Sequence, residues 1–372
     1  MLATVNKITS YLEELAPLSI ALPGDPVGLQ LGRPGAEVSR ALVALDPDQS
    51  AVDEAASIGA ELLVTHHPLF YHKLTSINES FPEGALVAGA IRNKLNIYSA
   101  HSNYDVSPQG VTYQLAKTMD LPLENAVVLE AAGSEQLLKL VVFIPAGHED
   151  NIRNALAAAG AGQIGRYSHC TFQTGGTGTF MPGEGTSPFI GTGGQLEKVD
   201  ELRLETILPA ARRAAVIEAL NEAHPYEEAA YDLYPLELEG KAVGLGLLLD
   251  LPGPLSLQEL LQKCRDRLDV NNLRCWNAGK DSFKRIALCG GSGGSLIRHA
   301  AGLEADIFIS GDFRYHDLKE AEGHGLALID AGHDATEKPG VDHLRQYLER
   351  KLQAGGYGTE VCLQTSAGAK WS

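Results

Sequence analysis

The stretch Glu61-Leu62-Leu63-Val64-Thr65-His66-His67-Pro68 joins an apolar run directly to two histidines and a proline. Residues 61–65 predict a buried strand, because a short continuous apolar run is typical of strands covered on both faces. Adjacent side chains of a strand point to opposite faces, so His66 and His67 can share a site only where the strand has already bent. Pro68 disfavours helix at His67 and ends the regular structure, which places the bend there.

Strands and helices alternate on both sides of this stretch. The first part of the chain predicts strands at 40–45, 61–65 and 96–100, and helices at 51–58, 84–95 and 111–119. The last part predicts strands at 285–288, 305–310 and 326–330, and helices ending at Ala301 and covering 316–322 and 342–352. Such alternation is typical of an α/β fold, and we expect a parallel-rich sheet with helices on both faces.

The segment between these two parts contains an internal repeat. Three groups of residues recur at a constant spacing: Pro145-Ala146, Ile152 and Ala155-Leu156, then Pro209-Ala210, Val216 and Ala219-Leu220. Each copy predicts strand, helix, strand, and two such units form a ferredoxin-like α+β fold. The alternative is chance recurrence in alanine-rich helices, which the shared strand, proline and helix order argues against. Between the copies, the Gly-, Thr- and Pro-rich residues 175–194 predict a long loop.

The domain organisation follows from this interruption. We expect residues 1–132 and 241–372 to be the first and second parts of one α/β domain. Residues 133–240 are expected to form the α+β insertion between them. Two domains also agree with the length of 372 residues, since single domains usually run to about 100–200 residues.

Side chains that bind divalent metals follow three predicted strands. The set comprises His66, His67, His101, Asp105, His333 and Glu337. A lone histidine at a strand end is usually a core or turn residue, but ligands gather at the carboxyl ends of parallel strands. We therefore expect these groups to meet at one edge of the sheet and to form a site for two ions such as Zn²⁺, Mn²⁺ or Fe²⁺. His101 is either a further ligand or a group that orients Asp105 or contacts the substrate.

A glycine-rich stretch, Cys289-Gly290-Gly291-Ser292-Gly293-Gly294, follows a predicted strand and precedes a helix. Backbone amides at Gly291 and Gly293 could hold an anion at the helix N-terminus. The stretch is neither a P-loop nor a proper Gly-x-Gly-x-x-Gly, although Asp312 lies about 20 residues further on, as a dinucleotide fold requires. We expect a tight turn or a contact to a substrate phosphate rather than a nicotinamide site.

Composition and charge limit the partners. The net charge of −17 gives a surface that repels phosphate backbones, so we expect no nucleic-acid partner. The five cysteines form no Cys-x-x-Cys pair, which suits a reducing compartment. The first residues predict an amphipathic helix rather than a signal peptide, and no apolar stretch approaches the roughly 20 residues that span a membrane. We expect a cytoplasmic protein with no membrane partner.

These motifs resemble the Ngg-interacting factor three family, also called dinuclear-metal-centre proteins and GTP cyclohydrolase 1 type 2 homologues. The resemblance covers nearly the whole chain. It rests on Asp25-Pro26-Val27-Gly28-Leu29-Gln30-Leu31-Gly32, Thr65-His66-His67-Pro68-Leu69-Phe70, Ala100-His101-Ser102-Asn103-Tyr104-Asp105, Ser310-Gly311-Asp312-Phe313-Arg314-Tyr315-His316-Asp317, and Asp330-Ala331-Gly332-His333 with Glu337. The resemblance implies that two divalent ions per chain are bound by His66, His67, Asp105, His333 and Glu337.

The resemblance carries further implications. Members of the family assemble as hexameric rings, so we expect a homo-oligomer. The insertion is similar to trimer-forming PII-like domains, whose signature His224-Pro225-Tyr226-Glu227-Glu228 matches. This sequence departs from the family at Gly24-Asp25-Pro26, where Trp-Asp-Asn is common, and at Asp334, where tyrosine is common. Neither departure removes a metal ligand, but both could alter the pocket. The resemblance therefore implies the metal ligands more securely than the substrate.

Two functions remain open from the sequence. The first is a metal-dependent hydrolase of the GTP cyclohydrolase 1 type 2 kind, acting on a small molecule such as a purine nucleotide. Hydrolysis needs a carboxylate for proton transfer, and Asp312 and Asp317 are the candidate catalytic residues. The alternative is a ring assembly that binds metal or senses a metabolite without turnover. Turnover of a purine nucleotide that depends on His333 would separate the two.

Overall fold

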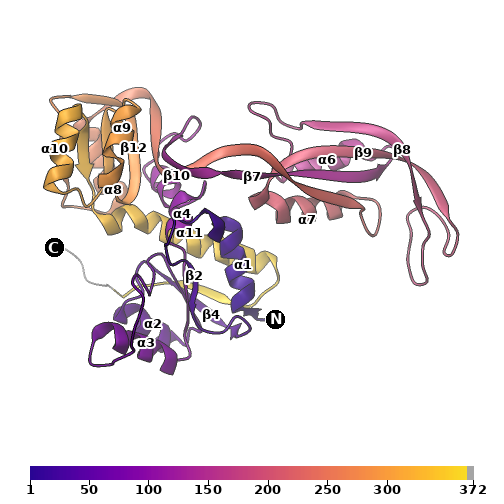
Figure 1. Cartoon of the computed structure of the whole chain (residues 1–372), viewed down its shortest axis with the longest axis horizontal. Helices are drawn as coiled ribbons and strands as arrows, with labels where there is room; N and C mark the ends of the chain where they lie inside the picture. The colour runs from indigo at the N-terminus through magenta and orange to yellow at the C-terminus, as the bar shows by residue number, and fades with distance from the viewer. Residues whose placement is uncertain (367–372) are drawn as a thin grey trace. The chain divides into compact units, whose positions relative to one another are not determined.

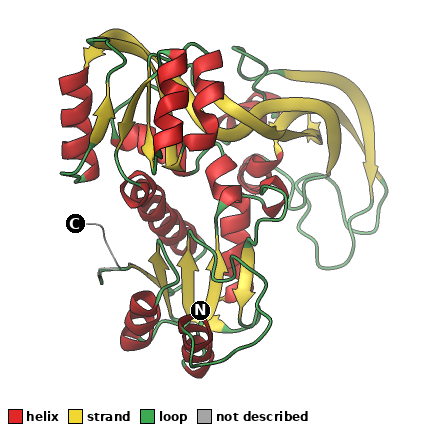
Figure 2. Cartoon of the chain, turned by 60° about the vertical axis from the view of Figure 1, so that its left-hand side comes forward, coloured by secondary structure: helices red, strands yellow, loops and turns green. Residues whose placement is uncertain are grey.

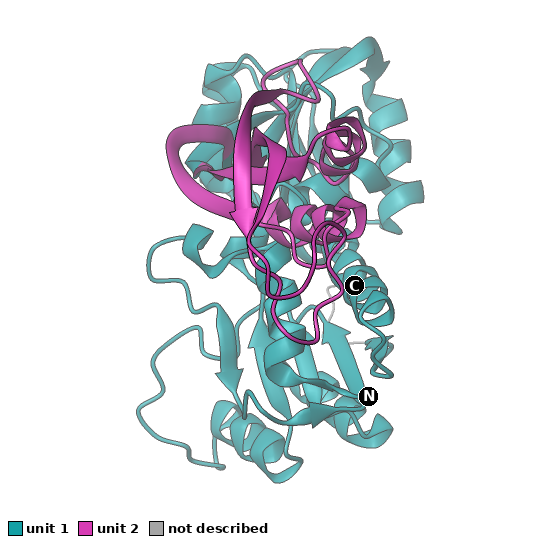
Figure 3. Cartoon of the chain, turned by 90° about the vertical axis from the view of Figure 1, so that its right-hand side faces the viewer, with its two compact units in different colours: residues 1–133, 243–372 teal, residues 134–242 magenta. Residues whose placement is uncertain are grey.

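The computed structural model describes residues 1–366, which divide into two compact units (Figures 1 and 3). Unit 1 comprises Met1–Gly133 and Val243–Ser372, and unit 2 comprises Ser134–Ala242. Strands β7 (Val127–Pro145) and β10 (Tyr231–Ser256) carry the chain out of unit 1 and back. The insertion therefore begins and ends inside two long strands rather than in flexible linkers.

The first sheet of unit 1 has the strand order β15-β4-β5-β6-β2. Strands β15, β4, β5 and β6 run parallel, and β2 pairs antiparallel with β6. The bounds are β2 Gly28–Leu31, β4 Arg40–Ala44, β5 Leu62–Thr65, β6 Asn96–Ser99 and β15 Glu360–Leu363. The side chains of β5 and β6 are all buried, as expected for strands covered on both faces.

Helices cover both faces of this sheet because its strand residues alternate between two cores. Val43 and Val64 pack with α1 (Val5–Leu15) and α11 (His333–Ala354) on one face. Leu42 and Leu63 pack with α2 (Gln49–Ile58) and α3 (Pro82–Arg92) on the other face. A short antiparallel pair, β1 (Ala3–Thr4) with β3 (Glu37–Val38), and the turn η1 (Leu18–Ile20) complete this part. The prediction of an α/β fold is confirmed here.

The second sheet of unit 1 has the order β11-β14-β13-β12-β10. Its inner strands β12, β13 and β14 are parallel, and β10 and β11 flank them in antiparallel pairs. Helices α5 and α8 pack on one face, while α9 and α10 pack on the other. Figure 2 shows the helices and strands of the chain in separate colours. The bounds are α5 Val111–Thr118, α8 Leu257–Leu268, β11 Arg274–Trp276, β12 Ser282–Ser292, η3 Gly294–Leu296, α9 Ile297–Gly302, β13 Ile307–Gly311, α10 Tyr315–His324 and β14 Ala327–Asp330.

Two expectations from the sequence are wrong in detail. Strands β5, β6 and β14 belong to two sheets, so their ends do not share one sheet edge, because strand periodicity does not reveal which strands pair. The final helix was expected at 342–352, but α11 begins at His333 and contains Pro339. The Pro339-Gly340 pair suggests a break, yet packing of α11 against strands of both sheets keeps the helix continuous.

Unit 2 contains helices α6 (Glu149–Ala158) and α7 (Arg213–Ala223) and strands β8 (Thr171–Phe180) and β9 (Glu197–Pro209). With β7 and β10 the strand order is β10-β7-β9-β8, and the two helices contact each other. This order, built from two strand-helix-strand units, is the ferredoxin-like arrangement. Leu140, Leu156, Leu204 and Leu220 contribute to its core.

The long loop of unit 2 is shorter than the composition indicates. Residues 175–180 belong to β8 rather than to a loop, because β8 pairs with β9 along its full length. Pairing with a neighbouring strand overrides the low strand propensity of the glycines. In the described part of the chain, no helix is long and apolar enough to cross a membrane.

Candidate metal site

Three histidines of unit 1 present the same ring nitrogen to a common centre. His66 and His67 follow β5, and His333 begins α11. The contacts at Nδ1 are His66 to the Ala100 carbonyl oxygen at 2.8 Å, His67 to Asp46 Oδ1 at 2.7 Å and His333 to Asp312 Oδ2 at 2.8 Å. Oxygen acceptors at Nδ1 fix the tautomer and ring orientation and leave Nε2 as the ligand atom, as in metal-binding histidines.

The Glu337 carboxylate lies among the three Nε2 atoms. Its Oε1 is 3.0 Å from His333 Nε2 and 3.5 Å from His66 Nε2, and its Oε2 is 3.2 Å from His67 Nε2. His333 and Glu337 are four residues apart on α11, so they share one helix face. Asp105, on α4 (Ser102–Val106), places Oδ1 at 3.6 Å from His66 Nε2. One carboxylate with three imidazoles around it is a typical donor set for divalent transition metals.

Two buried atoms at this centre lack hydrogen bonds. His66 Nε2 and Glu337 Oε2 are buried and make no hydrogen bond of normal geometry to the described residues. A buried polar atom left without a partner costs roughly 1–3 kcal/mol, so such atoms are rare unless another group satisfies them. A bound cation would accept the lone pairs of both atoms. The residues present therefore fit a divalent metal.

The pKa values of these groups show how the site balances its charge without a cation. Burial would raise the pKa of Glu337, but His66 and His333 hold it well below its usual range. Burial lowers the pKa of His67, but the hydrogen bond to Asp46 and the nearby negative charge of Glu337 outweigh this effect and raise the pKa to about 10. The hydrogen bond to Glu337 raises the pKa of His333 to about 9. Protons on histidines thus compensate the carboxylates, and a metal ion would replace them.

His101 lies beside the other three imidazoles. Its ring centroid is 5.3 Å from that of His66 and 5.7 Å from that of His67. Ligand atoms of His66, His67 and His101 lie within 4.8 Å of one another, and so do those of His67, His333 and Glu337. His67 is common to both groups. Five of the six sequence-predicted candidates are therefore brought together as two overlapping sets of ligand atoms, and Asp105 lies in neither set.

The partner of His101 Nδ1 is Asp25 rather than Asp105. The two oxygens of Asp25 lie 2.8 and 3.0 Å from this nitrogen, and Oδ2 also accepts from the backbone N–H of Ser102. Sequence reasoning did not assign a role to Asp25 or to Asp46, the partner of His67. The sequence contains a feature that could have pointed to each residue. Asp46 directly follows the predicted strand 40–45, and Asp25 lies in a stretch that resembles the family.

Gly291 and Gly293 fit closely against neighbouring side chains at the site. Gly291 has φ +68°, and a Cβ there would lie 2.3 Å from Glu337 Oε1 and 3.3 Å from His333 Nε2. Its backbone N–H donates to Thr336 Oγ1 at 2.9 Å. A Cβ at Gly293 would lie 2.4 Å from Ser310 Oγ. Only glycine lets this irregular end of β12 approach the ligands of α11 so closely.

The two candidate catalytic carboxylates occupy different environments. Asp312 has φ +55° and uses Oδ2 to hold His333, so it belongs to the immediate surroundings of the metal-binding groups. Asp317 is buried, and its Oδ2 accepts from the backbone N–H of Arg314 at 2.7 Å, which caps the start of α10. Asp317 is absent from the two metal-binding groups found among the described residues.

The fold and the site define an α/β protein with a buried histidine–carboxylate group that could bind metal, interrupted by an α+β unit. The chain belongs to the Duf34/NIF3 (NGG1p interacting factor 3) family, whose sequence model matches residues 3–367. It is 40% identical over 360 residues to a GTP cyclohydrolase 1 type 2 homolog of Halalkalibacterium halodurans, covering 97% of this chain and 96% of the relative.

Other relatives support the same family. The chain is 38% identical over 345 residues to a GTP cyclohydrolase 1 type 2 homolog of Bacillus subtilis, with 92% of each chain covered. The crystal structure of a Bacillus cereus protein related to NIF3 matches with a TM-score of 0.78 and 37% identity, covering 100% of this chain and 99% of that one. The match extends over both units, so the insertion is shared with that structure.

Proposed function

We propose that this chain is a hydrolase that depends on two divalent metal ions. His66, His67, Asp105, His333 and Glu337 would hold them. The observation that carries the proposal is the buried Glu337 carboxylate, which is surrounded by three oriented imidazoles and keeps one oxygen without a hydrogen bond. The proposal of a second ion is supported by a second set of ligand atoms, those of His66, His67 and His101, which shares His67 with the set of His67, His333 and Glu337.

Divalent ions bound there would supply the Lewis acidity that activates water for hydrolysis. The chain's own residues would do the rest. Asp46 and Asp312 fix the rings of His67 and His333, and Gly291 leaves room for Glu337 by having no side chain. His101, oriented by Asp25, would serve beside the ions either as a further ligand or as a group that exchanges a proton with the substrate.

The substrate we propose is a small molecule of the purine nucleotide class, because the relatives are named for GTP cyclohydrolase. The test is turnover of GTP by protein refilled with Zn²⁺ or Mn²⁺, followed by chromatography of the products. His333→Ala should abolish turnover, whereas His324→Ala, which alters an exposed histidine of the same unit, should leave it unchanged. Equal turnover in both variants would contradict the proposal.

A second candidate is a ring assembly that binds metal or senses a metabolite without turnover. The observation that favours self-association lies in unit 2, where β8 is the last strand of its sheet and exposes Phe172. Leu196 and Leu238 of the same unit are also more than half exposed. Exposed strand edges with apolar side chains are typical contact surfaces between chains. We propose a homo-oligomer, with a hexamer to be tested by analytical ultracentrifugation.

A further inference from the structure

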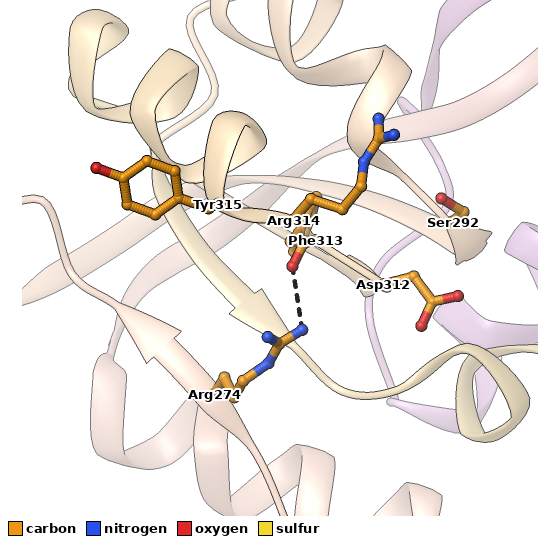
Figure 4. A pocket seen from close by; sticks show the side chains of 6 residues that line it. All are labelled: Arg274, Ser292, Asp312, Phe313, Arg314 and Tyr315. Atoms are coloured by element: carbon orange, nitrogen blue, oxygen red, sulfur yellow. Dashed lines mark hydrogen bonds between the residues drawn. The ribbon is translucent and has the colours of Figure 1, made fainter. Parts of the chain in front are cut away.

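A pocket of about 720 Å³ opens next to the metal-binding groups of unit 1. Its lining comprises Arg274, Ser292, Asp312, Phe313, Arg314 and Tyr315 (Figure 4). Ser292 ends β12 and Asp312 follows β13, so the pocket lies at the carboxyl ends of parallel strands, where α/β folds bind ligands. The volume lies in the range of small-molecule sites, which is about 300–1,000 Å³.

Two arginines of this pocket keep unused hydrogen-bond donors. Arg274 uses Nη2 to contact Asp330 and to donate to the Phe313 carbonyl at 3.1 Å. Arg314 uses Nε to contact Asp317 Oδ2 at 3.3 Å. The other guanidinium nitrogens of both residues make no hydrogen bond within residues 1–366. The two side chains are 72% and 81% exposed, so their donors can reach a ligand.

The surroundings of the arginines favour an anion. Besides contacting Arg274, the Asp330 carboxylate accepts hydrogen bonds from the backbone N–H groups of Phe313 and Gly332, both at 3.1 Å. Its negative charge is therefore stabilised by these donors as well as by Arg274. Asp312 is the single carboxylate among the lining residues, and its Oδ2 is occupied by His333. Among the lining residues there are thus two guanidinium groups and one carboxylate, while Asp330 and Asp317, which pair with the arginines, are buried.

The figure shows how these groups are arranged. Arg314 extends on the side of Ser292 and Asp312, the guanidinium of Arg274 approaches Phe313 from the opposite side, and the ring of Tyr315 points away from Asp312 (Figure 4). Asp312 is shared with the metal site through the 2.8 Å contact of Oδ2 with His333 Nδ1. A ligand held by the arginines would therefore lie directly beside the metal-binding histidines.

We infer that Arg274 and Arg314 bind a phosphate group of the substrate, so that the reacting part of the molecule extends to His333 and Glu337. Guanidinium groups recognise phosphate oxygens with paired, charge-assisted hydrogen bonds. The position of the reacting part rests on the proposed function, but the phosphate site itself does not. It can be tested on protein without metal.

The probe is inorganic pyrophosphate, titrated calorimetrically into full-length protein that has been stripped of metal with a chelator. Without metal, the pyrophosphate cannot bind to the ions. The variants are Arg314→Gln and Arg274→Lys, of which the second keeps the charge but loses the paired donors. Arg298→Gln is the matched control, because Arg298 is 80% exposed and also pairs with a carboxylate, that of Glu320.

Wild type and Arg298→Gln should bind pyrophosphate equally, and Arg314→Gln should weaken binding about tenfold. Arg274→Lys should weaken it too, with unchanged thermal unfolding. Equal binding by all four proteins, or no binding by wild type at millimolar concentration, would overturn the phosphate site. Zn²⁺ titration of the same proteins separates the two proposals. If wild type does not bind Zn²⁺ but still binds pyrophosphate, the proposed metal site is wrong and the phosphate site is retained.

Discussion

Replacing Gly291 with alanine should damage the metal site through a single added carbon atom. The left-handed backbone at φ +68° costs a residue with a Cβ roughly 1–2 kcal/mol. The Cβ would also lie 2.3 Å from Glu337 Oε1. Because carbon and oxygen atoms pack at about 3.5 Å, the carboxylate must retreat by about 1 Å. Displacing a ligand or its support typically lowers metal affinity about 10–100-fold.

Gly59→Ala is the matched control for this prediction. Gly59 also has φ +68°, but no atom lies within 4 Å of the Cβ position. It should lose roughly 1–2 kcal/mol of unfolding free energy and keep its metal affinity. Gly291→Ala should lose more stability and bind Zn²⁺ at least about tenfold more weakly. Urea unfolding of metal-free protein measures the stability, and Zn²⁺ titration against a competing chelator measures the affinity. Equal Zn²⁺ affinities of the two variants would refute the reasoning.

Three further predictions follow from single contacts. Asp312→Asn should weaken Zn²⁺ binding about tenfold in a chelator competition with little change in unfolding free energy, because Asp312 orients His333 and is 60% exposed. In metal-free protein, folding raises the pKa of His67 to about 10 and that of His333 to about 9. Protonation of these histidines therefore stabilises the fold fully below about pH 6.5, the pKa of a free histidine, and this stabilisation is lost as the pH rises through about 9 to 10. Zn²⁺ affinity should therefore rise with pH above about 6.5, with proton release in calorimetry, and a flat profile would contradict this. Leu156→Ala should cost about 2–5 kcal/mol in the unfolding of unit 2, since Leu156 is 1% exposed, while metal content per chain stays unchanged.

Much of the fold and the position of the candidate site could be predicted from the sequence. Apolar runs such as 61–65 predict buried strands because the period of the pattern follows directly from burial. The same pattern does not reveal which strands pair, so the division of unit 1 into two sheets was missed. The start of α11 at His333 was missed because tertiary packing keeps the helix continuous through Pro339.

The candidate ligand residues were predictable because strand ends and a resemblance to the family pointed to the same side chains. Their supporting contacts were not. Asp46 is 21 residues from His67 and Asp25 is 76 residues from His101, and only the folded chain shows that these pairs touch. The same holds for Arg274 and Arg314, whose common pocket depends on the pairing of β11 with β14.

Metal content per chain, measured by elemental analysis of untagged protein, tests the central claim most directly. Wild type and His324→Ala should hold about two transition-metal ions per chain, and His333→Ala should hold clearly fewer. Less than about half an ion in every protein, even after refilling with Zn²⁺ or Mn²⁺, would contradict the account.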